Sequence, residues 1–489
     1  MTRRRLIGLA GALFLCMLGL SALGQEYDAP THGPNVVLVM TDDMRMDDLQ
    51  YMPNTLHLLA EQGATFTQML SPYPLCCPAR AEVLSGQYAH NNGVQGNNWP
   101  RGGYYKLDNS NTLPVWLSAH GYLTGFMGKY LNEYGSRDPE EVPPGWDDWA
   151  GSLQHIYNYT NVVLSENGAV VPHPRVYQTD LFDHRSTGLV REFAGSDQPF
   201  FLWVSHIAPH AACSRAGVPT RQVTGRCWHP AVPQTADRGT FLDLTPLSDP
   251  SINEADMSDK SAFMQRLDRL TPAELAGQRF ARIQRIEALQ SVDRAVAHLV
   301  ATLKATGEYR DTYIVFTSDN GIQLGEHRWR YKVLGYEPSV RVPLIIEGPG
   351  VPHGVVRQQA VTTVDMAATV ADITGSAPGR VLDGQSVLPL ATGSVPDVRD
   401  RIVPLEAGPL RHSTPRWLYQ GVRTNRYTLL AWHNGDIELY DRQRDPYQVS
   451  SVDGDPTYAA VERDLLSSLR SLATCAGPAC MAWVGGRSP

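Results

Sequence analysis

The sequence predicts an α/β fold: a large, mainly parallel sheet sandwiched by helices, with a small C-terminal subdomain of antiparallel sheet plus helix. Short apolar runs recur along the chain, helical patterns lie between them, and polar residues directly follow several of the runs. Strands that alternate with helices form parallel sheets, which need helices on both faces. We therefore expect one wide sheet with a layer of helices on each side.

Four apolar runs are expected to be buried strands, because each is short and continuous. They are residues 36–40, 200–204, 313–316 and 344–346. Polar groups follow the first three runs: Asp42 and Asp43, then His206 and His210, then Asp319 and Asn320. In open α/β sheets, ligands bind at the carboxyl ends of the strands. A single Asp or Asn in a loop is usually structural, but three such strand ends together predict a site.

Helical patterns mark three stretches of the chain. Residues 53–63 are expected to form one helix, and residues 279–304 carry apolar side chains at spacings of three and four. In residues 76–86, Pro78 suits the first position of a helix and Gly86 suits its end. Cys76 is then expected just before a helix N-terminus, where free backbone N–H groups favour an anion.

The domain organisation is inferred from the length of the chain and from a change in its hydrophobic pattern. The chain has 489 residues, enough for two or three domains, or for one large α/β domain with an appendage. Beyond residue 395 the pattern changes to short alternating segments, such as 426–432, and a final helix near residues 459–472. We therefore expect a catalytic domain over residues 25–394 and an α+β subdomain over 395–489. Residues 211–260 are expected to form a long surface loop.

The composition excludes two protein classes. Hydrophobic residues make up 42% of the chain, which is enough for a large core and too much for a disordered chain. Lys and Arg number 42 against 50 Asp and Glu, giving a net charge of −8. A nucleic-acid binder needs basic stripes that displace counterions, so this balance argues against nucleic-acid partners.

The N-terminus predicts export. Three arginines at positions 3–5 precede an apolar run over residues 6–23, and Ala22-Leu23-Gly24 forms a small-x-small cleavage site. This is the pattern of a cleaved signal peptide over residues 1–24. The alternative is a membrane anchor, since the run approaches the length that spans a bilayer. We expect a secreted or periplasmic protein with no membrane span after cleavage.

The seven cysteines are an odd number for an oxidising compartment. Cys16 is removed with the signal peptide, and Cys76 and Cys77 are adjacent, an arrangement in which cysteines rarely pair with each other. Spacing suggests two pairs among the remaining four, although spacing cannot prove connectivity. These pairs are Cys213 with Cys227 and Cys475 with Cys480.

The pattern Cys76-x-Pro78-x-Arg80, followed four residues later by Ser85-Gly86, resembles the signature of the type I sulfatases. Ser85 stands where that signature usually has Thr, and Gln87 where a basic residue often follows. The resemblance extends from residue 35 to about residue 455, and it implies an alkaline-phosphatase-like fold.

Further motifs resemble the branch that holds the N-acetylglucosamine-6-sulfatases and the extracellular heparan endosulfatases. They include Leu75-Cys76-Cys77-Pro78, Tyr88-Ala89-His90-Asn91, residues 128–135 and Tyr157-Asn158-Tyr159. Leu131 replaces a histidine that many sulfatases carry two residues after the first lysine, and Asn132 is expected to fill part of that role in binding substrate. The Lys/Arg-rich insertion of the endosulfatases is missing.

The resemblance implies that Cys76 is converted to formylglycine by a formylglycine-generating enzyme, a covalent change that the sequence cannot show. One hydroxyl of the hydrated aldehyde attacks sulfur and forms a covalent sulfated intermediate, and the other then expels sulfate. An unmodified Ser or Cys would form a stable ester, because it has no second hydroxyl that could expel sulfate. Cys77 occupies a variable position of the signature and is expected to pack in the core.

The resemblance also implies the other site residues. Asp42, Asp43, Asp319 and Asn320, with the modified Cys76, are the expected metal ligands. Their oxygen donors favour Ca²⁺ over Zn²⁺. Arg80 is expected to bind the diol or the carboxylates, Lys129 and Lys332 to bind sulfate oxygens, and His210 to protonate the leaving alcohol, alone or with Lys332.

The expected activity is release of sulfate from a sulfated carbohydrate, such as N-acetylglucosamine 6-sulfate, or from an aryl sulfate. One alternative is a formylglycine-dependent phosphodiesterase or phosphonate hydrolase on the same scaffold. Another is an inactive homologue that binds sulfated glycans.

Overall fold

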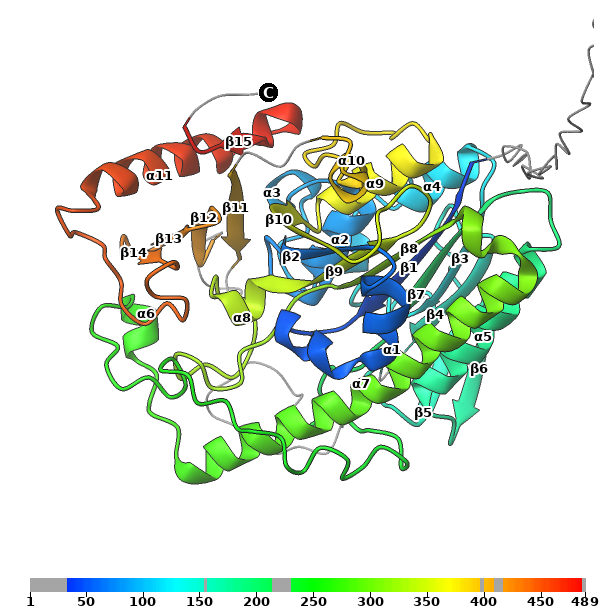
Figure 1. Cartoon of the computed structure of the whole chain (residues 1–489), viewed down its shortest axis with the longest axis horizontal. Coiled ribbons are helices and arrows are strands. Elements are labelled where there is room, and N and C mark those ends of the chain that lie inside the picture. Colours follow the sequence, from blue (N-terminus) through cyan, green and yellow to red (C-terminus); the bar gives the residue numbers. More distant parts are fainter. Residues whose placement is uncertain (1–32, 154–155, 213–229, 396–399, 409–416, 486–489) are drawn as a thin grey trace, which may run out of the picture. The chain divides into compact units, whose positions relative to one another are not determined.

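The main sheet has ten strands in the order β10-β2-β9-β8-β1-β7-β3-β4-β5-β6, as Figure 1 shows. The computed structural model describes residues 33–153, 156–212, 230–395, 400–408 and 417–485. The strands of this sheet are β1 (Asn35–Thr41), β2 (Ala64–Leu70), β3 (Leu123–Gly128), β4 (Asp148–Leu153), β5 (Asn161–Glu166), β6 (Ala169–Pro174), β7 (Phe200–Ser205), β8 (Thr312–Ser318), β9 (Arg341–Glu347) and β10 (Val355–Thr362).

The centre of the sheet is parallel, as predicted. Strands β8, β1, β7, β3 and β4 pair in parallel, and β10 pairs in parallel with β2. Strand β9 differs: it lies antiparallel between β8 and β2, and β5 and β6 extend the other edge as an antiparallel hairpin. The apolar run at 344–346 predicted this strand but not its direction.

The strands are continuously apolar because both faces of the sheet are covered. Val36, Leu38 and Met40 of β1 pack in one core cluster, and Val37 and Val39 pack in another on the opposite face. Helices α5 (Gln178–Phe193) and α7 (Pro272–Thr306) lie side by side over the second face (Figure 1). Helices α2 (Cys76–Ser85), α4 (Leu113–Ala119) and α9 (Asp365–Thr374) cover the first.

Two of the predicted helices begin or continue differently. Helix α2 begins at Cys76 itself, with Leu75 as its N-cap, so Pro78 lies at the third helical position and not the first. Gly86 ends the helix in a left-handed conformation, as predicted. The helix predicted over 53–63 is a short α1 (Pro53–Thr55) that continues as a π-helical turn, η2 (Leu56–Ala60). Other short α-helices are α3 (Ala89–Asn92), α6 (Ala262–Gln265), α8 (Glu337–Val340) and α10 (Leu388–Thr392).

A second, antiparallel sheet and a helix follow near the C-terminus. Its strands lie in the order β14-β13-β12-β11-β15, and α11 (Ala459–Leu472) spans the residues predicted for the final helix. The strands are β11 (Arg401–Ala407), β12 (Tyr419–Arg423), β13 (Tyr427–Trp432), β14 (Ile437–Asp441) and β15 (Ala482–Trp483). The domain boundary at residue 394 stays a prediction, because residues 32–489 form one compact unit.

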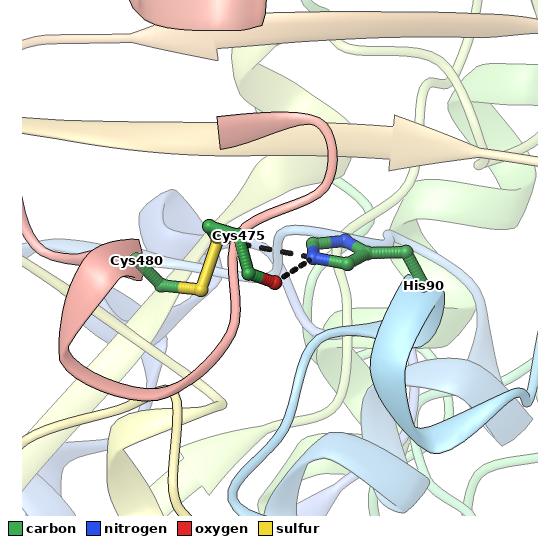
Figure 2. Close-up of side chains that lie close together, drawn as sticks. All are labelled: His90, Cys475 and Cys480. Carbon is green, nitrogen blue, oxygen red and sulfur yellow. Dashed lines mark hydrogen bonds between the residues drawn. A yellow bond between two sulfur atoms is a disulfide. The ribbon is translucent and has the colours of Figure 1, made fainter. Parts of the chain in front are cut away.

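One predicted disulfide is present. Cys475 and Cys480 are bonded and lie beside His90, as Figure 2 shows. Cys76 and Cys77 are free and buried, and Cys77 packs in the core as expected. Cys213, Cys227 and the predicted signal peptide lie outside the described residues.

The segment predicted as a surface loop is partly buried. Within its described part, residues 230–260, the side chains of Asn253, Glu254 and Lys260 are buried. Glu254 bonds His327 at 2.6 Å. Over the described parts of the chain, no helix has both the length and the apolar character that crossing a bilayer requires.

Candidate active site

Four parallel strands end at one edge of the sheet and bring the predicted residues together. Asp42 and Asp43 follow β1, Lys129 follows β3, His210 follows β7, and Asp319 follows β8. All five side chains are buried. Because β8, β1, β7 and β3 are neighbours in the sheet, these strand ends are adjacent.

Cys76 joins this edge from the N-terminus of α2. Its Sγ lies 3.6 Å from Asp42 Oδ1 and 2.8 Å from Lys332 Nζ. Burial, and then the charge of Asp42, raise the pKa of the Cys76 thiol to about 11. The thiol is therefore protonated at neutral pH, so an unmodified Cys76 is not an activated thiolate nucleophile.

Arg80 lies one helical turn after Cys76 and binds the carboxylates. Its Nε donates to Asp319 Oδ2 at 2.8 Å, and its Nη2 lies 3.4 Å from Asp42 Oδ2. Its Nη1 donates at 2.6 Å to both the Lys129 carbonyl and Ser205 Oγ. Arg80 therefore ties the ends of four strands to α2, and its position fixes the two carboxylates.

Each of the two aspartates after β1 contacts a lysine. Lys129 Nζ donates to Asp42, and Lys332 Nζ donates to Asp43. Burial alone would raise the pKa of Asp42, but Lys129, His210 and Arg80 outweigh it and lower the pKa. Burial is likewise outweighed at Asp43, where Lys332 and His210 lower the pKa. Both aspartates are thus held as carboxylates.

Lys129 depends on the glycine before it. Gly128 has φ 107°, and a Cβ there would lie 1.9 Å from the Ser205 carbonyl oxygen. Only glycine permits this close approach of β3 to β7. The lysine backbone then donates to that same carbonyl at 3.1 Å, which positions Lys129 over the cluster.

Asp319 and Asn320 complete an oxygen-rich group. Asp319 Oδ1 accepts from the backbone N–H of Asp43 at 3.0 Å, and Asn320 Nδ2 donates to Asp43 Oδ1 at 2.7 Å. Asn320 Oδ1 is buried and has no hydrogen-bond partner in the structure. An orphaned buried oxygen beside three carboxylates is the donor set of a hard divalent cation.

His210 lies at the same edge of the sheet, and a hydrogen bond and a stacked aromatic ring fix the orientation of its imidazole. Its Nδ1 donates to the Ala211 carbonyl at 2.7 Å, which leaves Nε2 3.5 Å from Asp43 Oδ2. The ring stacks on Tyr157 at 4.1 Å between centroids. Burial lowers the pKa of His210 in spite of Asp43 and Asp42. His210 is also close enough to ligate a metal, since atoms of Asp42, Asp43, Cys76 and His210 lie within 4.8 Å of one another.

Three further residues touch these groups, and their sequence positions did not predict a role for them. Tyr157 stacks on His210 and lies 5.0 Å from Lys129 Nζ. Ser205 bonds both Arg80 and the Lys129 carbonyl. Arg285 of α7 donates to the carbonyls of Asp43 and Pro209. Tyr157 lies in a motif of the sulfatase resemblance and Ser205 directly follows the predicted strand over residues 200–204, but neither pattern specified the contact.

Asn132 does not join this group through its side chain. Its carbonyl accepts from the Tyr104 N–H at 2.8 Å, and within the described residues its side chain makes no hydrogen bond to the carboxylates or Cys76. His206, His327, Asp47 and Asp48 are not among the potential metal ligands around Cys76. The name Cys76 cluster is used below for Cys76, Asp42, Asp43, Asp319, Asn320, Arg80, Lys129, His210 and Lys332.

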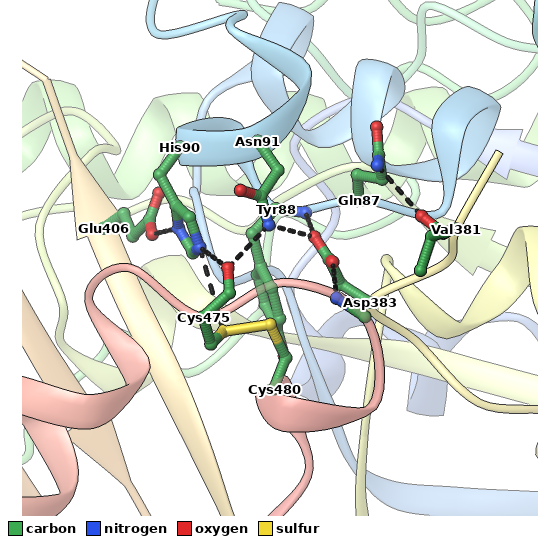
Figure 3. Close-up of a disulfide and its surroundings, with 10 residues drawn as sticks. Gln87, Tyr88, His90, Asn91, Val381, Asp383, Glu406, Cys475 and Cys480 are labelled. Carbon is green, nitrogen blue, oxygen red and sulfur yellow. Dashed lines mark hydrogen bonds and ion pairs between the residues drawn. A yellow bond between two sulfur atoms is a disulfide. The ribbon is translucent and has the colours of Figure 1, made fainter.

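A second group of ligating side chains lies around the disulfide (Figure 3). His90 Nδ1 bonds Glu406, and its Nε2 bonds the Cys475 carbonyl at 3.0 Å. Asp383 accepts from the backbone N–H groups of Tyr88 and Gly477, at 2.9 and 2.7 Å. The name disulfide cluster is used below for His90, Asp383, Glu406, Cys475 and Cys480.

Among curated proteins, an extracellular sulfatase SULF-1 homolog of Drosophila melanogaster is 33% identical over 75% of this chain, and the match spans 32% of that protein. An N-acetylglucosamine-6-sulfatase of Homo sapiens is 29% identical over 98% of this chain and 91% of its own length. This chain therefore spans about a third of the Drosophila relative and nearly all of the human one.

Solved structures share the fold. BT4656, in complex with its substrate D-glucosamine-2-N,6-O-disulfate, has a TM-score of 0.71 at 22% identity and covers 90% of this chain and 97% of its own. A phosphonate monoester hydrolase from Silicibacter pomeroyi has a TM-score of 0.64 at 22% identity, covering 90% of this chain and 94% of its own.

Two family profiles match the chain. A profile described as N-sulphoglucosamine sulphohydrolase, C-terminal, matches residues 325–474. The sulfatase profile matches residues 34–376, more than half of the chain, and with it every member of the Cys76 cluster. The chain belongs to the sulfatase family.

Proposed function

We propose that this sulfatase releases inorganic sulfate from a sulfated sugar, N-acetylglucosamine 6-sulfate or a related glycan, and that its nucleophile is a formylglycine made from Cys76. One observation carries the proposal: the buried Cys76 lies at a helix N-terminus, within hydrogen-bond reach of Lys332. The carboxylates of the Cys76 cluster lie beside it, together with Arg80, Lys129 and His210. A sulfate monoester needs such an arrangement, because its oxygens carry negative charge that buried cations must stabilise.

Formylglycine would supply a hydroxyl nucleophile through its hydrated aldehyde. Its oxygen is attached to the Cβ that carries Sγ in the unmodified residue. Lys332 Nζ, 2.8 Å from Sγ, is placed to donate to a group at that position. Lys129 and Lys332 each contact one aspartate, so a sulfate that enters the site finds two buried ammonium groups whose charge is already partly balanced.

The metal ligands we propose are Asp42, Asp43, Asp319 and Asn320, with the modified residue 76. Ca²⁺ suits their oxygen donors and would act as a Lewis acid toward the sulfate oxygens. Arg80 would hold Asp42 and Asp319 in place, since it bonds both. The unpartnered Asn320 Oδ1 supports this set, because an occupied site would satisfy it.

We assign the proton that the departing alcohol needs to His210, alone or with Lys332. Because burial lowers the pKa of His210, this role requires the form in which Nε2 is also protonated. Its Nδ1 is committed to a backbone carbonyl, so Nε2 is the atom that can transfer a proton. The parallel Tyr157 ring limits rotation of the imidazole. General acids of this kind contribute about 10²–10⁴-fold to the rate.

The substrate class rests on relatives whose names mention N-acetylglucosamine 6-sulfate or extracellular sulfatase action. Export is also a proposal: the Cys475–Cys480 disulfide suits an oxidising compartment. N-terminal sequencing of the secreted protein is expected to begin near residue 25.

The test is turnover of paired substrates by the purified protein. We expect an aryl sulfate to be hydrolysed faster than the matching aryl phosphodiester. Within a panel of sulfated monosaccharides, N-acetylglucosamine 6-sulfate should give the highest kcat/KM. Faster hydrolysis of the diester would contradict sulfatase function, and preference for another sugar would contradict only the substrate.

A further inference from the structure

An exposed tryptophan lies on a loop beside the N-terminus of α2. The side chain of Trp99 is 51% exposed, although large apolar groups are normally covered. Two cations lie over its ring: the Arg137 guanidinium at 5.3 Å and Lys106 Nζ at 6.0 Å from the ring centroid. Both cations are exposed and neither forms a salt bridge within the described residues, in a chain whose net charge is −8. They are therefore available to an anion.

The loop is hydrogen-bonded to the first turn of the helix that carries Cys76. Asn97 Oδ1 accepts from the backbone N–H of Cys77 at 3.0 Å, so the loop covers the first turn of α2. Trp99 follows two residues later, and two residues span at most ~7 Å. The Trp99 N–H donates to Glu133 at 2.9 Å, four residues after Lys129. The tryptophan thus lies within one or two sugar lengths of the helix turn that carries Cys76.

The loop is held in one conformation. Gly102 N–H donates to the Asn98 carbonyl at 2.9 Å, and a Cβ at Gly102 would lie 1.6 Å from the Gly96 carbonyl oxygen. The backbone at Gly102 therefore packs directly against the backbone at Gly96, an approach that only glycine permits. Tyr105 also positions Arg137: the Arg137 guanidinium lies 4.0 Å from the Tyr105 ring centroid, and the backbone N–H of Arg137 donates to the Tyr105 hydroxyl. A preformed site of this kind binds without the cost of ordering a loop.

We propose that Trp99, Arg137 and Lys106 form a second binding subsite, for a sulfated sugar residue next to the one being desulfated. The part of the indole that the two cations leave exposed can contact the apolar face of a sugar ring, and the guanidinium and ammonium groups beside it bind sulfate oxygens. This inference rests on the proposed function, since it assumes that the substrate is an oligosaccharide. Under this proposal, Trp99, Arg137 and Lys106, which lie outside the Cys76 cluster, make the enzyme prefer an oligosaccharide to a monosaccharide.

The first experiment compares a long and a short substrate. Trp99→Ala and Arg137→Ala are assayed on a heparin-derived tetrasaccharide and on N-acetylglucosamine 6-sulfate. The ratio of kcat/KM, tetrasaccharide over monosaccharide, is expected to fall about 10-fold, mostly through KM. Lys304→Ala is the matched control, because Lys304 also lies over an aromatic ring, that of Tyr309, but at the opposite edge of the sheet before β8. An unchanged ratio in both variants would overturn the subsite.

The second experiment separates this inference from the proposed function. Cys76→Ala protein, which does not turn over substrate under the proposal, is titrated with the same tetrasaccharide by calorimetry. Adding Arg137→Ala is expected to raise the Kd about 10-fold, whereas adding Lys304→Ala leaves it unchanged. If wild-type protein hydrolyses no sulfate ester but this Kd shift is seen, the proposed reaction fails and the subsite stands. Equal Kd values in both double variants overturn the subsite, whatever the activity.

Discussion

The Cys76 cluster and the disulfide cluster both bring potential metal ligands within 4.8 Å of one another. In the disulfide cluster the sulfur atoms are bonded to each other, and both nitrogens of His90 face acceptors. In the Cys76 cluster the sulfur is free, and a buried amide oxygen of Asn320 has no partner. Both clusters therefore share the closeness of their ligating atoms, and each holds one unpartnered buried oxygen, since Glu406 Oε2 also has no hydrogen-bond partner. The free sulfur of Cys76 distinguishes the site that we assign to chemistry from the one that we assign to stability.

Charge separates the two clusters as well. Arg80, Lys129 and Lys332 contact the carboxylates around Cys76, so the site contains cations that a sulfate can use. Among the five members of the disulfide cluster, His90 alone can become cationic, and Glu406 already pairs with it. The predictions below change one cluster at a time, so that loss of activity and loss of stability can be told apart.

The largest effect is expected at Cys76. Cys76→Ala removes the precursor of the proposed nucleophile, so kcat should fall by at least about 10³-fold while the unfolding midpoint changes little. Cys77→Ala is the matched control, since this neighbour is equally buried and free but packs in the core. Steady-state assays of both variants give the comparison. Similar activities in the two would remove Cys76 from its assigned role.

The second-largest loss of activity is expected when a proposed metal ligand is removed. Asp319→Asn is expected to lower kcat/KM by about 10²-fold or more and to weaken Ca²⁺ binding, because the carboxylate also holds Arg80. The wild-type protein should lose activity in a chelator and regain it with Ca²⁺ better than with Zn²⁺. Asp293→Asn serves as control, since Asp293 is a buried acid that bonds Asn54 and Thr55 instead. Full activity of Asp319→Asn in chelator would exclude a metal at this site.

The disulfide should affect stability instead. Closing the loop from Cys475 to Cys480 restricts the unfolded chain, so the double variant Cys475→Ser/Cys480→Ser should lower the free energy of unfolding by about 2 kcal/mol. Its kcat/KM below the unfolding transition should stay within about twofold of wild type. Urea denaturation and a sulfatase assay on the same preparation measure both quantities. A loss of activity comparable to that of Cys76→Ala would erase the distinction between the clusters.

The smallest effect is a pH dependence at His90. Burial opposes the charged imidazole, but the hydrogen bond and charge of Glu406 outweigh it and raise the pKa of His90. Its stabilising contribution is then complete below the unfolded pKa of about 6.5 and is lost as pH rises through the higher folded value. His90→Gln should therefore cost more free energy of unfolding at pH 6 than at pH 9, as measured by urea unfolding. His57→Gln is the control, because the His57–Glu61 pair is exposed and should show no such difference. Equal costs of His90→Gln at the two pH values would contradict the account.

Much of the sheet edge that carries the Cys76 cluster could be predicted, because it follows local rules. Apolar runs predicted β1, β7 and β8, and the polar residues after them lie together because parallel strands end at one edge. The start of α2 was predicted two residues late, since Pro78 is equally compatible with the third helical position. The direction of β9 was not predictable, because an apolar run is the same read either way.

Contacts between distant segments could not be predicted. Tyr157 reaches His210 from beyond β4, and Arg285 reaches Asp43 from the middle of a helix whose pattern indicated only core packing. The Cys475–Cys480 pair was predictable from its short spacing around a Gly-Pro turn, but its bonds to His90 and Asn91 were not. Local composition specifies elements and short loops, and only the fold brings together residues far apart in sequence.

The most direct test is the mass of the peptide that contains residue 76, isolated from active protein. Conversion of the thiol to an aldehyde replaces sulfur with oxygen and removes two hydrogens, so the peptide should be ~18 Da lighter than its sequence requires. The same digest should show Cys77 as an unmodified thiol, which provides an internal control. Fully active protein whose residue 76 retains the mass of cysteine would contradict the proposed nucleophile.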